Sequence, residues 1–308
     1  MKFKIIVFSA FGMLLLGTHA YAADAAKADI QWAGCGITKK AFMAELAKAY
    51  TKKTGVTIKL SGGGATKGIR KAAAGDIDIG GACRVSLENH PLERNAHQTP
   101  VAWDALVAIT SQDNPVDNIS LENLKKIYLG QITNWKQLGG KNAPIELYVR
   151  RGKMSGVGRT LRELVFNNFD QEFKATYVVK SSGPVEKGII KNINGIGVSG
   201  ISSAKRRKVG DKGLKLLKIN GKAPTYENIK SGQYVLYRPL YLVTKRGEKD
   251  PKIRAFIRFA VSREGQDIIR KQGTVPYTEA MALVMKQLDQ YDAAIKKGAY
   301  RTAVSTSR

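Results

Sequence analysis

The chain has 308 residues, 43% of them hydrophobic, which is enough for one large domain or two of moderate size. It carries 51 Lys and Arg against 25 Asp and Glu, and the net charge of +26 indicates an anionic ligand, an anionic surface or nucleic acid as a partner. We do not expect nucleic acid, because the basic residues are spread over the whole sequence without interleaved aromatic residues. A metal site is not expected, because two cysteines cannot complete a zinc site and the histidines lack ligand spacing.

The first 22 residues have the features of a secretory signal peptide. Lys2 and Lys4 give it a positive start, residues 5–16 are apolar, and a small-x-small cleavage motif ends at Ala22. The apolar run is too short for a retained membrane span, and no later segment is long enough to cross a bilayer. No cysteine adjoins the cleavage site to carry a lipid anchor. We therefore expect cleavage after Ala22 and export of the mature protein to the periplasm.

Strands that alternate with helices dominate the rest of the chain. We expect strands at residues 29–33, 56–60 and 77–84, with helices at 38–52 and 66–74. Further strands are expected at 100–110, 145–149, 194–200 and 236–243, and further helices after Ser120, after Ser155, over 250–271 and from Gln287. The charged run at 205–212 is expected to be an exposed, solvated loop. The alternation predicts an α/β fold with parallel pairing, in which ligands bind at the carboxyl ends of the strands.

Glycine-rich turns between a strand and a helix recur at three places. They are Gly34-Cys35-Gly36 before Thr38, Gly62-Gly63-Gly64 before Thr66, and Ser155-Gly156-Val157-Gly158. Such a turn leaves backbone N–H groups unpaired at the positive end of a helix dipole, which favours an anion. Three of these turns in one chain predict that several helix starts meet around one small anion.

The chain resembles the periplasmic phosphate-binding proteins of ABC-type uptake systems over nearly all of the mature sequence. The motifs that carry this resemblance are Gly34-x-Gly36-x-Thr38, Gly62-Gly63-Gly64-x-Thr66-x-Gly68-Ile69, the run from Gly75 to Arg84, Asn114-Pro115, the run from Gly130 to Trp135, Arg238-Pro239-Leu240-Tyr241, and the run from Ser262 to Gln266. The resemblance implies two lobes, each a mainly parallel sheet flanked by helices, with an anion in the cleft between them. Lobe 1 would take residues 23–104 and 237–308, and lobe 2 would take 105–236. Hinge strands near 103–108 and 234–240 would join them.

The resemblance also implies a set of ligand-binding residues. Hydroxyl donors fall on Thr38 and Thr66, a backbone donor on Lys39, an arginine clamp on Arg151, and a further donor turn on Ser155, Gly156 and Val157. A guanidinium suits a tetrahedral oxyanion because its planar fork donates two hydrogen bonds. The alternative is that the hydroxyls are ordinary helix caps and that Arg151 makes a surface salt bridge.

Three positions depart from the family pattern. Cys83 stands where some members place an Asp, Val157 replaces a Thr, and Lys153 replaces an acidic residue. A thiol is a poor acceptor for the proton of a protonated oxyanion. With Arg84 beside it, the site becomes more positive and poorer in acceptors, so we expect a fully ionised tetrahedral anion. Phosphate is the leading ligand, with sulfate, arsenate or an organic phosphate as alternatives.

The two cysteines, Cys35 and Cys83, are a candidate disulfide. An even pair in an oxidising compartment favours a bridge. Both are expected at matching ends of neighbouring parallel strands, whose spacing of about 5 Å is compatible with disulfide geometry. The alternative is two small buried thiols.

Three functions are compatible with these residues. The first is a monomeric binding protein that hands an oxyanion to a membrane ABC permease, without catalysis, cofactor or metal. The second is an enzyme that uses Cys83 beside Arg84 as an activated thiolate, although the C-x5-R spacing of cysteine phosphatases is absent. The third is a relative that has lost transport and binds a protein or an anionic surface through its basic face.

Overall fold

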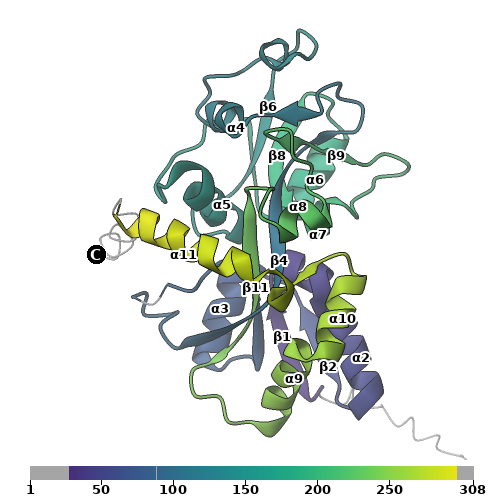
Figure 1. Cartoon of the computed structure of the whole chain (residues 1–308), viewed down its shortest axis with the longest axis vertical. Helices are drawn as coiled ribbons and strands as arrows, with labels where there is room; N and C mark the ends of the chain where they lie inside the picture. The colour runs from purple at the N-terminus through teal and green to yellow at the C-terminus, as the bar shows by residue number, and fades with distance from the viewer. Residues whose placement is uncertain (1–27, 88, 297–308) are drawn as a thin grey trace, which may run out of the picture.

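A computed structural model of the chain describes residues 28–87 and 89–296, so the expected signal peptide and its cleavage site lie outside the described residues. The described chain forms two α/β lobes, one above the other in Figure 1. A ten-stranded sheet follows the path β2-β1-β3-β11-β4-β8-β6-β7, with β9 and β12 also paired to β4. The two-lobed α/β fold expected from the sequence is confirmed.

The lower lobe in Figure 1, lobe 1, contains the first two strand–turn–helix units, the strand that follows them and the last helices of the chain. Its strands are β1 (Ile30–Gly34), β2 (Ile58–Ser61), β3 (Ile79–Ala82) and β12 (Val275–Pro276). Its first helix has three parts: α1 (Gly36–Thr38) continues through the π-helical turn η1 (Lys39–Met43) into α2 (Ala44–Thr54). Its other helices are α3 (Gly64–Ala74), α9 (Pro251–Val261), α10 (Arg263–Lys271), η4 (Tyr277–Ala280) and α11 (Met281–Lys296). β1 pairs in parallel with both β2 and β3, as expected from the alternation of strands and helices.

The upper lobe, lobe 2, contains the middle of the chain. Its strands are β5 (Asn118–Ile119), β6 (Glu146–Arg150), β7 (Tyr177–Val179), β8 (Gly195–Gly200), β9 (Leu214–Leu216) and β10 (Lys218–Ile219). Its helices are α4 (Leu121–Tyr128), η2 (Trp135–Leu138), α5 (Gly156–Leu161) with η3 (Arg162–Phe166), α6 (Ser182–Ile190), α7 (Ile201–Ala204) and α8 (Tyr226–Lys230). β6 lies between β7 and β8 and is parallel to both.

Two long antiparallel strands connect the lobes, β4 (Ala96–Ser111) and β11 (Tyr237–Lys245). The first part of β4 pairs with β11 as far as Ala105, and the part from Leu106 onward pairs with β8 of lobe 2. Residues 101–111 of β4 are all buried, as is expected for a strand covered on both faces. β4 therefore carries backbone hydrogen bonds of both lobes.

Small residues set the position of the helix starts at the cleft. In α3, the apolar residues Ala65, Ile69 and Ala72 are buried on one face of the helix. On that face Gly68 packs directly on the strands, because an added Cβ would lie 2.8 Å from the carbonyl oxygen of Ala33 and 2.9 Å from that of Gly81. The close approach places the first turn of α3 next to the ends of β1 and β3.

Two helices near the C-terminus differ from the sequence prediction. The expected helix over 250–271 is two helices, because Ser262 is extended and its Oγ caps α10 by accepting a hydrogen bond from Gly265 N at 3.3 Å. The final helix begins at Met281, earlier than expected. No helix among residues 28–87 and 89–296 has the length and apolar character that a membrane crossing requires.

Candidate functional site

A pocket of about 360 Å³ lies between the two lobes, and we call it the cleft pocket. From lobe 1 it is lined by residues 35–37, Lys40 and 62–64, and from lobe 2 by Arg150, 180–183, Ser203 and Arg207. Most of these residues follow the carboxyl ends of β1, β2, β6 and β7. Ligands bind α/β sheets at this edge, because the loops there lie between strand ends and helix starts.

Two helix N-termini that line the cleft pocket have no side-chain cap. α3 begins after Gly63, which has φ 144° and no side chain to offer. The N-cap residue of α6 is Ser181, whose hydroxyl makes no capping hydrogen bond. Ser120 and Thr225, by contrast, accept capping hydrogen bonds at the starts of α4 and α8. The first N–H groups of α3 and α6 therefore lack a side-chain acceptor and can donate to an anion.

Two buried polar atoms in the pocket wall have no hydrogen-bond partner among the described residues. They are Nε of Arg150, at the end of β6, and Oγ of Ser182, in the first turn of α6. Ser182 is only 8% exposed. Buried polar groups in native proteins almost always have a partner, so both atoms are candidate donors to a ligand in the pocket.

The charges around the cleft pocket are basic. Lys40, Arg150, Lys180 and Arg207 line it, and among its described lining residues there is no Asp or Glu. Arg207 is paired with the buried Glu186, with Nε 2.7 Å from the carboxylate. Lys40 donates to Ser203 Oγ at 3.1 Å, and its pKa is lowered by burial and by the charge of Arg207. The pocket therefore suits an anion.

Thr38 and Thr66 lie beside the cleft, but their hydroxyls are already engaged. Thr38 is buried and donates to the carbonyl oxygen of Ala82 at 3.3 Å. Thr66 donates across the lobes to the carbonyl oxygen of Met154 at 2.8 Å. The N–H of Lys39 is used within its helix, where it donates to Cys35 O at 3.0 Å.

Arg84 is buried in an ion pair that sequence analysis missed. Its guanidinium donates to both carboxylate oxygens of Glu93, at 2.8 Å and 2.7 Å, and to Thr66 Oγ1 at 3.1 Å. These bonds hold the pKa of Glu93 below its usual value although burial raises it. Arg84 thus carries a structural charge pair and does not line the cleft pocket.

The expected clamp, Arg151, is exposed and does not line the cleft pocket. Its neighbour Arg150 does. Arg150 is the last residue of β6, and successive side chains along a strand point to opposite faces. A shift of one residue therefore decides which of the two guanidinium groups lines the pocket.

The turn expected to donate from lobe 2 forms a contact between the lobes. Ser155 Oγ accepts from Gly158 N at 3.0 Å and caps α5. Gly156 packs on Cys83, since an added Cβ would lie 2.3 Å from Cys83 Sγ, and Val157 is buried. Arg238 Nη1 also donates to the carbonyl oxygens of Cys83 and Gly156, both at 3.2 Å. This part of the cleft is filled by protein contacts.

Cys35 and Cys83 are free thiols whose Sγ atoms lie 2.9 Å apart. The hydrogen bond with Cys83 lowers the pKa of Cys35 to about 6, against the effect of burial, and the nearby charge of Arg238 lowers it further. The pKa of Cys83 is raised by the hydrogen bond with Cys35 and by burial. The disulfide stays a prediction.

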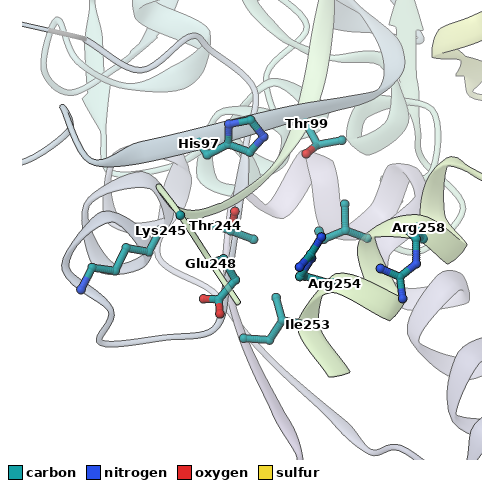
Figure 2. A pocket seen from close by; sticks show the side chains of 10 residues that line it. His97, Thr99, Thr244, Lys245, Glu248, Ile253, Arg254 and Arg258 are labelled. Atoms are coloured by element: carbon teal, nitrogen blue, oxygen red, sulfur yellow. The ribbon is translucent and has the colours of Figure 1, made fainter. Parts of the chain in front are cut away.

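A second hollow of about 360 Å³ lies between β4, β11 and α9. Figure 2 shows His97 and Thr99 on one side of it and Arg254 and Arg258 on the other. Glu248 lines it as well, and its described lining residues include no buried polar atom without a partner. The cleft pocket is the stronger candidate site.

Sequence analysis missed the whole lobe 2 side of the cleft pocket, and it missed Lys40 of lobe 1; the lobe 2 residues are Arg150, residues 180–183, Ser203 and Arg207. The run Lys180-Ser181-Ser182-Gly183 follows a strand and starts a helix, so it repeats the signal of the other three turns. Arg207 lies in the charged run that was expected to be solvated, and it is instead half-buried against Glu186.

Comparison with known proteins gives consistent results. The family described as PBP superfamily domain matches residues 20–264. The chain is 37% identical over 193 residues to the phosphate-binding protein PstS of Borreliella burgdorferi, which covers 61% of this chain and 68% of that protein. It is 27% identical over 260 residues to PstS of Bacillus subtilis, which covers 83% of each.

Two solved structures with the same fold are named for phosphate transport. A phosphate ABC transporter substrate-binding protein from Clostridium perfringens, with bound phosphate, matches with a TM-score of 0.71 and 29% identity over 80% of this chain and 98% of that one. An ABC-type phosphate transport receptor from Vibrio cholerae matches with a TM-score of 0.61 and 26% identity over 80% of this chain and 99% of that one. The chain therefore belongs to the PBP superfamily and, within it, to the family of phosphate-binding proteins.

Proposed function

We propose that this protein captures phosphate in the cleft pocket and delivers it to the membrane permease of an ABC transporter. The observation that carries the proposal is the buried, unpartnered Nε of Arg150 in the wall of a basic pocket between two lobes. That Nε–H has no acceptor among the described residues, and a tetrahedral oxyanion supplies one. Relatives and solved neighbours named for phosphate binding support the choice of ligand.

In this proposal the anion is held from both lobes. Lobe 1 contributes the N–H groups at Gly36 and at the start of α3, and lobe 2 contributes Arg150, Ser182 and the start of α6. The residues expected from the resemblance lie beside the pocket. Thr66 of lobe 1 donates to Met154 of lobe 2, and Cys83 of lobe 1 packs on Gly156 of lobe 2. In this proposal these contacts set how closely the two lobes approach each other. Donors from both lobes favour the closed cleft once the anion is bound.

We propose that lobe 1 comprises residues 23–104 and 237–308, that lobe 2 comprises residues 105–236, and that β4 and β11 act as the hinge where the chain passes between the lobes. Motion about these strands opens and closes the cleft. We further propose that the protein works as a monomer outside the cytoplasm, as its expected signal peptide implies, and that it binds phosphate without a chemical step, a cofactor or a metal.

The composition of the pocket predicts its selectivity. No carboxylate lies among its described lining residues, so the site has no strong acceptor for the proton of a protonated oxyanion. We expect the affinity for phosphate to rise from pH 6 to pH 8, as the dianion replaces the monoanion, and sulfate and arsenate to compete.

Isothermal titration calorimetry of the mature protein with phosphate, sulfate and arsenate between pH 5 and pH 9 tests the proposal. Saturable phosphate binding with one site per chain is the expected result. Absence of binding to all three anions would overturn it and favour a protein that binds a partner through its basic face.

A further inference from the structure

Cys35 and Cys83 come together at one edge of the lobe 1 sheet. Cys35 follows β1 and Cys83 follows β3, and these strands pair in parallel with Gly34 opposite Gly81. Their Sγ atoms are 2.9 Å apart and both side chains are buried. A disulfide has an S–S distance of about 2.05 Å, so a shift of roughly 0.9 Å between the sulfurs is enough to form the bond.

We propose that Cys35 and Cys83 are a redox-active pair that is oxidised to a disulfide in the exported protein, with Cys35 attacking the oxidant and Cys83 closing the bond. The proposal depends on the proposed function only for the location of the protein outside the cytoplasm, where disulfides persist. Because Cys35 lines the cleft pocket, the oxidation state of the pair changes the chemistry of one wall of that pocket.

The two thiols differ in access. Cys35 lines the cleft pocket of about 360 Å³, and its side chain is 2% exposed. Cys83 is fully buried, and Gly156 of lobe 2 packs directly on its sulfur. Cys83 is not among the residues that line the cleft pocket, and the cavity that it does border has a volume of only about 20 Å³. Of the two cysteines, Cys35 is therefore the one that borders a cavity large enough to admit part of an oxidant.

The electrostatics of the pair favour the same order. The Cys83 hydrogen bond, the charge of Arg238 and the N–H groups of Thr38 and Ile37 at the helix start lower the pKa of Cys35 to about 6. The pKa of Cys83 is raised by its hydrogen bond to Cys35 and by burial. The thiolate is the attacking species in disulfide exchange, so Cys35 is the nucleophile of the pair.

The reaction is a two-step exchange with an external disulfide such as oxidised glutathione. The Cys35 thiolate attacks one sulfur of that disulfide, forms a mixed disulfide and releases the first glutathione thiolate. Cys83 then loses its proton and attacks the Cys35 sulfur, which breaks the mixed bond and releases the second glutathione thiolate. The two cysteines lose two electrons and two protons, and one glutathione disulfide is reduced to two thiols.

Oxidation also bears on the contact between the lobes. Cys83 Sγ is the atom on which Gly156 packs, and the Cys83 carbonyl accepts from Arg238. A bond to Cys35 fixes that sulfur relative to the β1 turn, which itself lines the cleft pocket.

The test uses the mature chain from Ala23, without denaturant, incubated with oxidised glutathione. Free thiols are then counted by alkylation in denaturant and intact mass. The wild type is expected to lose both thiols and to retain no glutathione. Cys83→Ser is expected to retain one glutathione on Cys35, whereas Cys35→Ser is expected to keep Cys83 as a free thiol. Circular dichroism verifies that each variant is folded.

Two results would overturn the proposal. One is a wild type that keeps both thiols after prolonged incubation, a measurement that needs no variant. The other is glutathione retained on Cys83 in Cys35→Ser as fast as on Cys35 in Cys83→Ser. Neither result involves phosphate, so calorimetry on the same reduced sample tells failure of this proposal from failure of the proposed function.

Discussion

Arg238 and Asp104 lie opposite each other on the two strands that connect the lobes, and Arg238 donates to Asp104 Oδ2 from Nη2 at 3.0 Å and from Nε at 3.3 Å. Both side chains are almost completely buried. The same guanidinium donates through Nη1 to the carbonyl oxygens of Cys83 in lobe 1 and Gly156 in lobe 2. One buried cation therefore ties the connecting strands to both sides of the cleft.

Loss of Arg238 should be costly. Arg238→Ala leaves Asp104 buried without its cation, and breaking such a pair lowers the free energy of unfolding by about 3–5 kcal/mol. Lys252→Ala is the matched control, because Lys252 makes an exposed ion pair with Asp29 and should cost much less. Urea denaturation of both variants measures the difference. Equal losses would show that the Arg238 pair does not stabilise the fold as described.

Two serines at helix starts should behave in opposite ways. Ser182→Ala removes a hydroxyl without a partner among the described residues, so stability should hold while phosphate affinity falls by about tenfold, the lower end of the range for a hydrogen bond to a charged acceptor. Ser155→Ala removes the cap of α5 and should lower the free energy of unfolding by about 1 kcal/mol with little change in affinity. Thermal melts and calorimetry on both variants test the contrast, and the reverse pattern would place the ligand at Ser155.

Gly156 should control how closely the lobes approach. A Cβ in Gly156→Ala would lie 2.3 Å from Cys83 Sγ and 3.3 Å from Ala65 Cβ, so the contact between the lobes must open. Small-angle scattering should show a larger radius of gyration than that of the wild type. Gly62→Ala is the control, because an added Cβ there meets nothing within 4 Å. An unchanged radius in Gly156→Ala would mean that the lobes do not depend on this contact.

Acid should weaken the fold through Glu93. Although burial raises its pKa, the hydrogen bonds and charge of Arg84 hold the pKa of Glu93 below the ordinary 4.5. The stabilisation is therefore complete above pH 4.5 and is lost as the pH falls through the lower folded pKa. Unfolding free energies between pH 6 and pH 3 should fall less steeply in Glu93→Gln than in the wild type. Parallel curves would assign the acid sensitivity to other carboxylates.

Much of the fold can be predicted from the sequence, because apolar periodicity and glycine-rich turns are local signals. The turns at Gly36 and Gly62 can be identified from such signals, and both line the cleft pocket.

The binding site was harder to predict than the fold. Adjacent side chains at the end of β6 point to opposite faces, and no local pattern shows whether the face of Arg150 or that of Arg151 borders the pocket. Arg84 was assigned to the ligand because its partner Glu93 becomes apparent only when the chain folds. Ser182 follows a strand of three residues, too short for a clear period.

The identity of the clamp arginine is the most direct test of this account. Arg150→Ala and Arg151→Ala remove the same charge from adjacent positions, so the pair separates a specific contact from general electrostatics. We predict that Arg150→Ala weakens phosphate binding by about 10- to 150-fold, the range for a hydrogen bond to a charged group. Arg151→Ala should change it by no more than about threefold. Calorimetric titration of both folded variants with phosphate decides the matter: loss of binding in Arg151→Ala with binding retained in Arg150→Ala would contradict the account.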